Sequence, residues 1–307
     1  MKILVTGGAG YVGWSVVHEL ASTKEVKDIV VYDNLSRNNY GLLLGQRPRT
    51  TAKIKVVVDE LLNCRGLSHA LRGVDCVIHL AAIAPSPDTD NKPHFFDQVN
   101  HWGTAELGYA VEQQGVPRLV YLSSGAVYGH PEGIATIDTV PLPVTAYGRS
   151  KLAGERQLQR LSSKLDLRII RAGTVYGVNP SVRFDTFVNR FLLDASLGRP
   201  LNVHGSGEQV RPIVPVDEVA RFVVSAALQE EHTGLSHAVA TNTSVNEVVA
   251  GLRRSVSGLE VIYINQQQRL NDLKMSVGES RWIVSGKEKE NLSKRLKKDR
   301  ANLSISE

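Results

Sequence analysis

The sequence predicts an α/β protein built on a doubly wound parallel sheet, followed by a smaller C-terminal α/β domain. Two features indicate this class. Short apolar runs alternate with longer stretches of helical periodicity along the first part of the chain, and a glycine-rich loop joins the first apolar run to the first helix. Parallel neighbouring strands need a long crossover connection, which is usually a helix. The alternation therefore predicts helices on both faces of one sheet.

The expected elements follow in chain order. Short apolar runs predict strands at Lys2–Thr6, Asp28–Tyr32, Ile54–Val58, Val74–Leu80, Leu119–Leu122 and Leu167–Ile170. Helical spacing between them predicts helices at Val12–Ala21, Gly66–Arg72, Phe95–Gln114 and Ala146–Ser163. Beyond about Arg171 glycine and proline become more frequent, and we expect short strands with helices at Val216–Leu228 and Val245–Ser255. The first domain is therefore expected to span residues 1–172, with a return segment near 213–240, and the second to span 173–212 and 241–307.

Composition limits the classes of protein to which the chain can belong. Of its 307 residues, 42% are hydrophobic and 22% are charged, as in an ordinary globular protein. No apolar run reaches the roughly 18 residues of a membrane span, and Met1–Thr6 lacks the features of a secretion signal, so we expect no membrane partner. The two cysteines, Cys64 and Cys76, predict neither a disulfide framework nor a metal site, and they fit a reducing cytoplasm.

The net charge of +5 is concentrated near the C-terminal end of the sequence. Basic residues are dense between Lys287 and Arg300, but Glu288, Glu290 and Asp299 interrupt them and no aromatic residue lies among them. A nucleic-acid-binding segment would favour an uninterrupted basic stretch with interleaved aromatic side chains. We therefore expect a solvated terminal helix and no nucleic-acid partner.

A glycine loop at residues 6–13, T-G-G-A-G-Y-V-G, follows the first strand and opens the first helix. A pyrophosphate needs backbone N–H groups that no side chain covers, and it gains from the positive end of a helix dipole. In a Rossmann-type fold Gly7 would permit the tight turn, Gly10 the close approach of the phosphates, and Gly13 the packing of the helix on the strand. The loop therefore predicts a bound dinucleotide.

An acidic residue, Asp33, ends the second strand twenty positions beyond Gly13. Its carboxylate would accept hydrogen bonds from the adenosine ribose and would repel a 2′-phosphate, which favours NAD over NADP. Arg37 nearby is an alternative ligand for that 2′-phosphate, although a surface position suits it better.

Tyr147 and Lys151 lie four residues apart on an expected helix, which places both side chains on one face. Tyrosine has an unperturbed pKa of about 10 and is a poor base at neutral pH. A neighbouring ammonium favours the phenolate, so the spacing has a chemical purpose. Ser124 ends the fifth strand, at the edge of the sheet where α/β active sites lie, and would hydrogen-bond the reacting oxygen.

These motifs together resemble the extended short-chain dehydrogenase/reductase family, in its NAD-dependent nucleotide-sugar epimerase/dehydratase branch. The pattern is most similar to that of UDP-glucose/UDP-galactose 4-epimerases. The matching segments are T-G-G-A-G-Y-V-G at 6–13, Y-D-N-L-S at 32–36, H-L-A-A at 79–82, V-N-x-x-G-T at 99–104, L-S-S-G-A-V-Y-G at 122–129, Y-G-R-S-K at 147–151 and V-Y-G at 175–177.

The resemblance implies an NAD-binding first domain and a substrate-binding second domain. It implies Tyr147 as the acid/base, Lys151 as its partner and nicotinamide-ribose ligand, and Ser124 as the hydroxyl-binding residue. The implied cofactor-binding residues, some of them through backbone, are Gly7, Gly10, Tyr11, Val12, Gly13, Asp33, Asn34, Asp59, Glu60, Leu80, Ala81, Ala82, Asn100, Tyr147 and Lys151. Among these, Asp59 would reach the adenine and Asn100 would support the active-site region.

The C-terminal part resembles the family's nucleotide-binding segments. G-S-G-E-Q-V-R at 205–211 implies that Arg211 contacts a diphosphate, and R-L-N-D at 269–272 implies a second phosphate ligand in Arg269 and a ribose ligand in Asp272. Two arginines suit a diphosphate because their forked donors match its charge and shape. Thr174 stands where the family usually has an asparagine on the diphosphate, and Asn189 is a further candidate for the same pocket. Pro212 and Leu270 also depart from the family pattern.

The two residues after Ser124 narrow the expected reaction. Family 4,6-dehydratases carry an Asp–Glu pair there, whereas this chain has Gly125 and Ala126. Without a carboxylate there is no evident acid and base for eliminating water. We therefore expect C4 epimerisation of a UDP- or dTDP-sugar through a transient 4-keto intermediate, with NAD regenerated in each turnover.

Two alternatives remain open. One is a nucleotide-sugar 4-ketoreductase that consumes NAD(P)H. The other is a non-catalytic NAD-binding sensor or scaffold, which the presence of Tyr147 and Lys151 disfavours. The resemblance also implies a homodimer that pairs through the helices at 95–114 and 146–163 as a four-helix interface.

Overall fold

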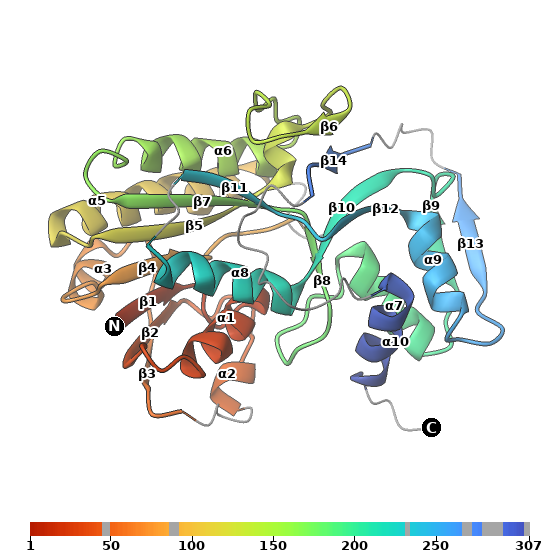
Figure 1. Cartoon of the computed structure of the whole chain (residues 1–307), viewed down its shortest axis with the longest axis horizontal. Coiled ribbons are helices and arrows are strands. Elements are labelled where there is room, and N and C mark those ends of the chain that lie inside the picture. The colour runs from red at the N-terminus through yellow and green to blue at the C-terminus, as the bar shows by residue number, and fades with distance from the viewer. Residues whose placement is uncertain (45–49, 86–91, 231–233, 266–271, 278–290, 304–307) are drawn as a thin grey trace.

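A seven-stranded parallel sheet forms the centre of the larger part of the molecule (Figure 1). The computed structural model describes residues 1–44, 50–85, 92–230, 234–265, 272–277 and 291–303. The strand order is β11-β7-β5-β4-β1-β2-β3, and every neighbouring pair is parallel. The strands are β1 (Lys2–Thr6), β2 (Asp28–Asp33), β3 (Lys53–Val58), β4 (Cys76–His79), β5 (Arg118–Ser124), β7 (Asp166–Ala172) and β11 (Gly234–Ala238).

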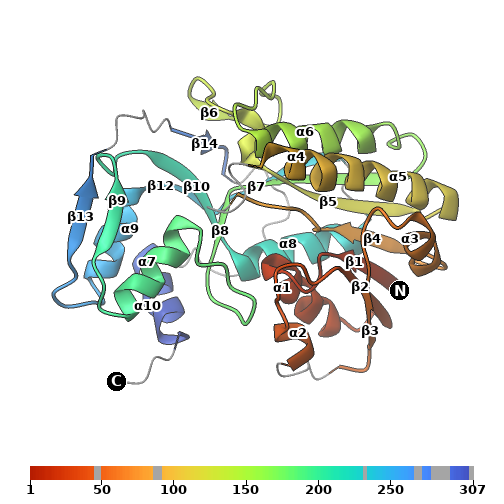
Figure 2. The same ribbon diagram turned by 180° about the vertical axis from the view of Figure 1, so that it is seen from behind.

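Helices cover both faces of this sheet, as the sequence predicted. On one face lie α1 (Tyr11–Ala21) and α8 (Val216–Leu228); on the other lie α3 (Cys64–Ala70), α5 (Gly103–Gln114) and α6 (Ala146–Gln159) (Figures 1 and 2). Each face encloses its own apolar core. The central strands β1, β2, β4 and β5 read as nearly unbroken apolar runs because both of their faces are buried.

The expected helix at 95–114 is a composite element. It consists of α4 (Pro93–Phe96), a six-residue π-helix η1 (Asp97–Trp102) and α5 (Gly103–Gln114). π-helical turns are rare and occur frequently at functional sites. Here the π-helix carries Asn100, which is fully buried.

A second part of the chain packs beside the carboxyl edge of the large sheet (Figure 1). Its strands are β8 (Thr174–Tyr176), β9 (Leu201–His204), β10 (Val210–Pro215), β12 (Thr241–Ser244) and β13 (Val261–Ile264), and its helices are α7 (Phe187–Ser196), α9 (Val245–Arg253) and α10 (Leu292–Ala301). These helices and strands share a separate apolar core. The helix α7 was not predicted.

Smaller elements complete the described chain. They are α2 (Gly41–Leu44), the 3-10 turn η2 (Gly125–Tyr128), β6 (Ile134–Ala135) and its partner β14 (Lys274–Met275). The expected terminal helix is present as α10, but it is not simply solvated, because Arg295, Leu296 and Asp299 are buried; Lys287 and Lys289 lie outside the described residues. In the part of the chain that the structure describes, none of the helices has the length and apolar character needed to span a membrane.

Candidate functional site

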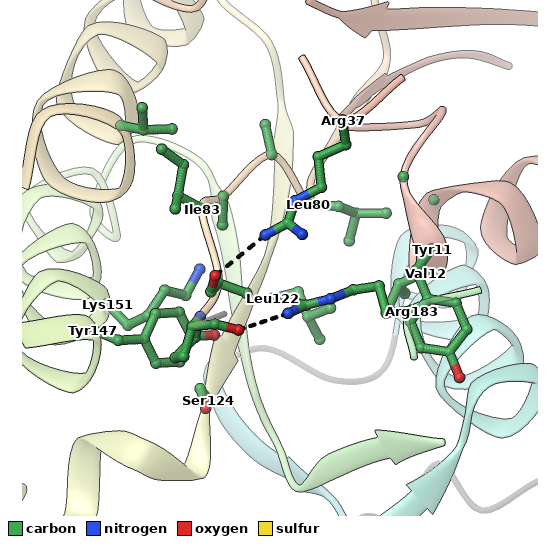
Figure 3. Close-up of a pocket in the computed structure, with 18 of the residues that line it drawn as sticks. Tyr11, Val12, Arg37, Leu80, Ile83, Leu122, Ser124, Tyr147, Lys151 and Arg183 are labelled. Atoms are coloured by element: carbon green, nitrogen blue, oxygen red, sulfur yellow. Dashed lines mark hydrogen bonds between the residues drawn. The ribbon is translucent and has the colours of Figure 1, made fainter. Parts of the chain in front are cut away.

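A cavity of about 950 Å³ lies at the carboxyl ends of β1, β2, β4 and β5 and extends to β8 and β10. Ligands of open α/β sheets bind at this edge. The glycine loop forms one wall of the cavity, and the start of α6 forms the opposite wall (Figure 3). Its volume lies at the upper end of the usual range for small-molecule sites, about 300–1,000 Å³.

The glycine loop is packed so closely that side chains are excluded from two of its positions. Gly7 has φ +67, and a Cβ there would lie 2.6 Å from the backbone nitrogen of Ala81. A Cβ on Gly13 would lie 2.1 Å from the carbonyl oxygen of Gly7. The helix α1 begins at Tyr11, and its N-cap residue, Gly10, has no side chain to cap it. Its first backbone N–H groups therefore stand at the cavity with no competing side chain.

Polar residues gather at the β2 and β3 end of the cavity. The Asp33 carboxylate accepts hydrogen bonds from the backbone nitrogens of Ala9 (3.0 Å) and Leu35 (2.9 Å), so it ties the glycine loop to the end of β2. Asn34 donates to Glu60 at 3.1 Å. The Asp59 carboxylate accepts hydrogen bonds from the backbone nitrogen of Glu60 and from the Asn63 side chain. The bond from Asn63 holds the pKa of Asp59 below its usual range.

Ser124, Tyr147 and Lys151 meet at the other end of the cavity (Figure 3). Ser124 ends β5, and its hydroxyl accepts from the backbone nitrogen of Ala126 at 3.2 Å. The Thr145 hydroxyl caps α6 by accepting from Gly148 at 2.9 Å, which fixes the first turn of the helix that carries Tyr147 and Lys151.

Burial dominates the electrostatics of Tyr147. It raises the pKa of the phenol, while a side-chain hydrogen bond with Ser124 and the positive charge of Arg183 act in the opposite direction. A group whose ionisation is opposed by burial and favoured by specific neighbours is typical of a functional site.

Lys151 is almost completely buried, with 2% of its surface exposed. Its Nζ lies 4.2 Å from the centre of the Tyr121 ring. Burial lowers the pKa of Lys151 to about 7, and the charge of Glu155 counteracts this. Tyr121 stacks in turn on His79, whose pKa is held well below its usual range first by burial and then by the Lys151 charge.

Asn100 lies behind the cavity wall. Its side-chain amide accepts from the backbone nitrogen of Ile83 and donates to the carbonyl oxygen of the same residue, both at 2.8 Å. It also donates to the Ser150 hydroxyl at 3.0 Å. The loop after β4 is thereby joined to α6, one residue before Lys151.

Among the described residues, the structure brings most of the predicted site residues to the cavity, while Asn100, Asn189 and Asp272 do not line it. Thr174 and Arg211 line it, as do Tyr11, Val12, Leu80, Ala81 and Ala82. Asn189 is fully buried away from the lining, because its amide accepts from Gly177 and donates to Arg183 and to the Tyr11 hydroxyl. Asp272 instead accepts from the backbone nitrogen of Val210 at 2.9 Å. Arg269 lies outside the described residues.

The family model for the NAD dependent epimerase/dehydratase family matches residues 3–239, more than half of the chain. The chain belongs to this family.

Relatives and solved structures agree with that assignment. The chain is 30% identical to a UDP-glucose 4-epimerase of Azospirillum brasilense over 283 residues (85% of this chain, 78% of the relative), and 29% identical to one of Bacillus subtilis over 298 residues (89% and 87%). Among solved structures it resembles MoeE5 in complex with UDP-glucuronic acid and NAD, with a TM-score of 0.82, 26% identity and 98% coverage of each chain. The protein is therefore an enzyme of the NAD dependent epimerase/dehydratase family, as predicted.

The residues at the glycine loop fit NAD, the cofactor of this family. The uncapped start of α1 offers backbone N–H donors to a pyrophosphate, and the side-chain-free positions at Gly7 and Gly13 keep the loop tight. The carboxylate of Asp33 at the end of β2 suits ribose hydroxyls and disfavours a 2′-phosphate.

Sequence reasoning missed one group of cavity residues in the loop before α7. Arg183 donates from Nε and Nη2 to the two carboxylate oxygens of Asp185 (2.9 and 2.7 Å) and from Nη2 to the carbonyl oxygen of Pro85 (2.8 Å). Arg37 contributes a longer ion pair with Asp185, at 3.8 Å, and donates to the carbonyl oxygen of Ala84 (Figure 3). R-F-D at 183–185 belongs to none of the motifs, so no sequence signal pointed to these residues.

Proposed function

We propose that the protein is an NAD-dependent nucleotide-sugar epimerase that inverts C4 of a UDP-hexose or a dTDP-hexose. The observation that carries this proposal is the surroundings of Gly125, the residue after Ser124. A Cβ at this position would lie 2.4 Å from the sulfur of Met275, which is itself fully buried. An aspartate at this position, as in family dehydratases, would require the Met275 side chain to move, and the glycine present supplies no acid for the elimination of water.

The side chains of the cavity can move the proton that epimerisation requires. Bound NAD supplies the two-electron oxidation at C4 and its reversal. Tyr147, as phenolate, takes the proton of the C4 hydroxyl and later returns it, while the Lys151 ammonium stabilises the phenolate charge. Ser124 donates a hydrogen bond to the same oxygen in its keto state. The 4-keto sugar exposes its other face between the two half-reactions.

Arg211 is our proposed ligand for the substrate diphosphate. It lies on β10, lines the cavity, and donates to the backbone carbonyl of Val210 at 2.8 Å, which orients its guanidinium. Planar forked donors suit the oxygens of a diphosphate. Thr174, on the neighbouring strand β8, lines the same wall.

The proposal is tested by incubating the purified protein with UDP-glucose, UDP-N-acetylglucosamine, UDP-glucuronic acid, dTDP-glucose and GDP-mannose without added reductant. We expect one or more C4 epimers by chromatography, with no net change in nicotinamide absorbance. Stoichiometric oxidation of NADH with a 4-keto sugar would instead identify a ketoreductase. No conversion of any of these sugars would contradict the proposal.

We propose that residues 1–172 and the return segment near 213–240 form the NAD-binding domain, and that 173–212 and 241–307 bind substrate. Two observations support this division: β11 pairs within the large sheet, and α8 packs on one of its faces. So does the separate apolar core around α7, α9 and α10.

We also infer a homodimer formed through the helices at 95–114 and 146–163. Large apolar side chains on the first of these remain exposed: Phe95 by 37%, Trp102 by 55% and Tyr109 by 50%. Light scattering should give twice the chain mass of 33.6 kDa. Trp102→Glu should then yield a monomer, whereas Leu44→Glu, at an 83% exposed position on α2, should not. A monomeric wild-type protein would contradict the inference.

We place the reaction in the cytoplasm. Cys64 is an exposed free thiol and Cys76 a buried one. Exposed free thiols are typical of proteins in reducing compartments. Fractionation of expressing cells tests this assignment.

A further inference from the structure

A buried carboxylate lies one helical turn beyond Lys151. Tyr147, Lys151 and Glu155 are spaced at four-residue intervals along α6, so their side chains follow one face of the helix. Glu155 is completely buried. Burying a carboxylate completely costs desolvation free energy unless the charge is paired and hydrogen-bonded. The position of Glu155 therefore requires a physical explanation.

The partners of Glu155 hold it firmly. The Ser123 hydroxyl donates to Oε1 at 2.5 Å. Arg171, on β7, donates from Nε to Oε1 at 3.0 Å and from Nη2 to Oε2 at 2.6 Å. Such a two-point arginine–carboxylate contact fixes both the position and the orientation of the carboxylate.

The network continues away from the cavity. Arg171 also donates to the Tyr128 hydroxyl at 2.8 Å, and that hydroxyl lies 2.6 Å from Nε2 of His237 on β11. Nδ1 of His237 lies 3.0 Å from the Ser276 hydroxyl. Neighbouring elements thus fix Arg171, which in turn fixes Glu155.

We propose that Glu155 is a positioning residue that keeps the Lys151 side chain in its ammonium form beside Tyr147, and that Arg171 and Ser123 hold it in place for this purpose. The inference rests on the proposed function, in which Tyr147 acts as phenolate. The ring of Tyr121 accommodates the same ammonium from β5. The Tyr121 ring thus contacts the ammonium, while Tyr147 and Glu155 stand four residues before and after Lys151 on α6, and of these three groups Glu155 supplies the negative charge.

The surroundings of Lys151 determine in which direction the loss of Glu155 would change its protonation. Burial brings the pKa of Lys151 down to about 7, and Glu155 is the group that opposes this. His79 lies behind Tyr121 and is kept neutral by burial and by the Lys151 charge, so it adds no positive charge. Arg171 adds positive charge on the far side of Glu155. Loss of the carboxylate would therefore favour the neutral amine of Lys151.

The primary test is the pH dependence of the NAD-loaded enzyme after Glu155→Gln. The active form needs the proton on Lys151, so the alkaline limb of kcat should move to lower pH by about one pH unit. Ser123→Ala removes a neutral donor and retains the carboxylate, so its limb should stay within a few tenths of the wild-type value. Glu155→Asp keeps the negative charge, so the pH position of its alkaline limb should lie close to that of the wild type.

A second measurement is independent of turnover. The protonation of Lys151 itself can be followed by NMR in lysine-labelled protein, with the signal assigned by comparison with Lys151→Arg. Its titration should occur at lower pH after Glu155→Gln. If the wild type epimerises no sugar, the proposed function fails, yet this titration still reports on Glu155.

If Glu155→Gln does not fold, the double variant Glu155→Leu/Arg171→Met replaces the buried pair with apolar side chains, a change that proteins often tolerate. Its alkaline limb and its Lys151 titration should be displaced in the same direction, by less. Variants that fold and lose thermal stability, but keep both wild-type pH dependences, would overturn the proposal and leave Glu155 with a structural role alone.

Discussion

Gly10→Ala should weaken the binding of NAD while leaving the stability of the fold nearly unchanged. Gly10 has φ −70 and ψ 178, an extended conformation that any residue adopts. A Cβ there would meet one atom within 4 Å, the Gly7 carbonyl oxygen at 3.1 Å. The entropy that alanine removes from the unfolded chain, about 0.4–1 kcal/mol, offsets this modest crowding. The melting temperature of the free protein should therefore change by no more than about 2 °C.

The same methyl group would stand where we expect the pyrophosphate to approach the loop. Inserting a methyl group into a closely packed contact costs about 1–3 kcal/mol. At 1.4 kcal/mol per factor of ten, NAD should bind about 5- to 150-fold more weakly. Calorimetric titration of NAD into nucleotide-free protein measures this, and the NAD content of the purified protein should fall in parallel.

Gly13→Ala is the matched control. Its Cβ would lie 2.1 Å from the Gly7 carbonyl oxygen and 2.6 Å from Cα of Gly8, both backbone atoms that cannot swing aside. We expect a loss of about 3 kcal/mol or more in the free energy of unfolding, and roughly 6 °C in melting temperature. If Gly10→Ala bound NAD within twofold of the wild type, the glycine loop would not be the pyrophosphate site.

Three further predictions concern single side chains. Tyr147→Phe should lower kcat by at least about 100-fold, the usual contribution of a general acid–base, while the protein retains its NAD; turnover near the wild-type rate would exclude Tyr147 as the base. Arg211→Leu should raise KM for the nucleotide-sugar by about 10- to 150-fold, because a charged hydrogen bond contributes about 1.5–3 kcal/mol, with a smaller change in kcat; an unchanged KM would remove Arg211 from the diphosphate site. Asn100→Ala leaves the partly buried backbone groups of Ile83 without their side-chain partner and should lower the urea midpoint by the equivalent of about 1–3 kcal/mol; an unaltered midpoint would show that this contact contributes nothing to stability.

The strands β1 to β5 and β7 of the large sheet could be predicted because they are largely apolar, whereas the edge strand β11, G-L-S-H-A, shows no apolar run and was not predicted. Val216–Leu228 was predicted with its observed bounds, since its apolar face covers the sheet. The helix α7 was missed because the glycines and prolines around it suggested irregular structure, and Thr186 at its start makes no side-chain cap. The pair of β6 and β14 joins only two residues from each strand, too few for a period to show in sequence.

At the site too, residues in local sequence motifs could be predicted, whereas contacts between distant segments could not. Ser124, Tyr147 and Lys151 belong to short contiguous patterns, so the sequence named them. The contact between Arg183 and the carbonyl of Pro85 spans 98 residues of chain, and no local pattern encodes it. The sequence also offered Asn189 as a polar candidate without showing that its amide is already engaged by Gly177 and Arg183.

The order of strands in the large sheet constrains when it can be completed during synthesis. The strand β11 pairs with β7, although more than sixty positions separate Ala172 from Gly234, and the Arg168 side chain donates to the carbonyls of Ala226 and Gln229. Until those residues leave the ribosome, β7 is an open edge and the sheet face that α8 covers is bare. Unpaired strand edges recruit other chains. The nascent protein is therefore most prone to aggregation between the emergence of β7 and that of β11, and late nonlocal pairing of this kind makes folding slow.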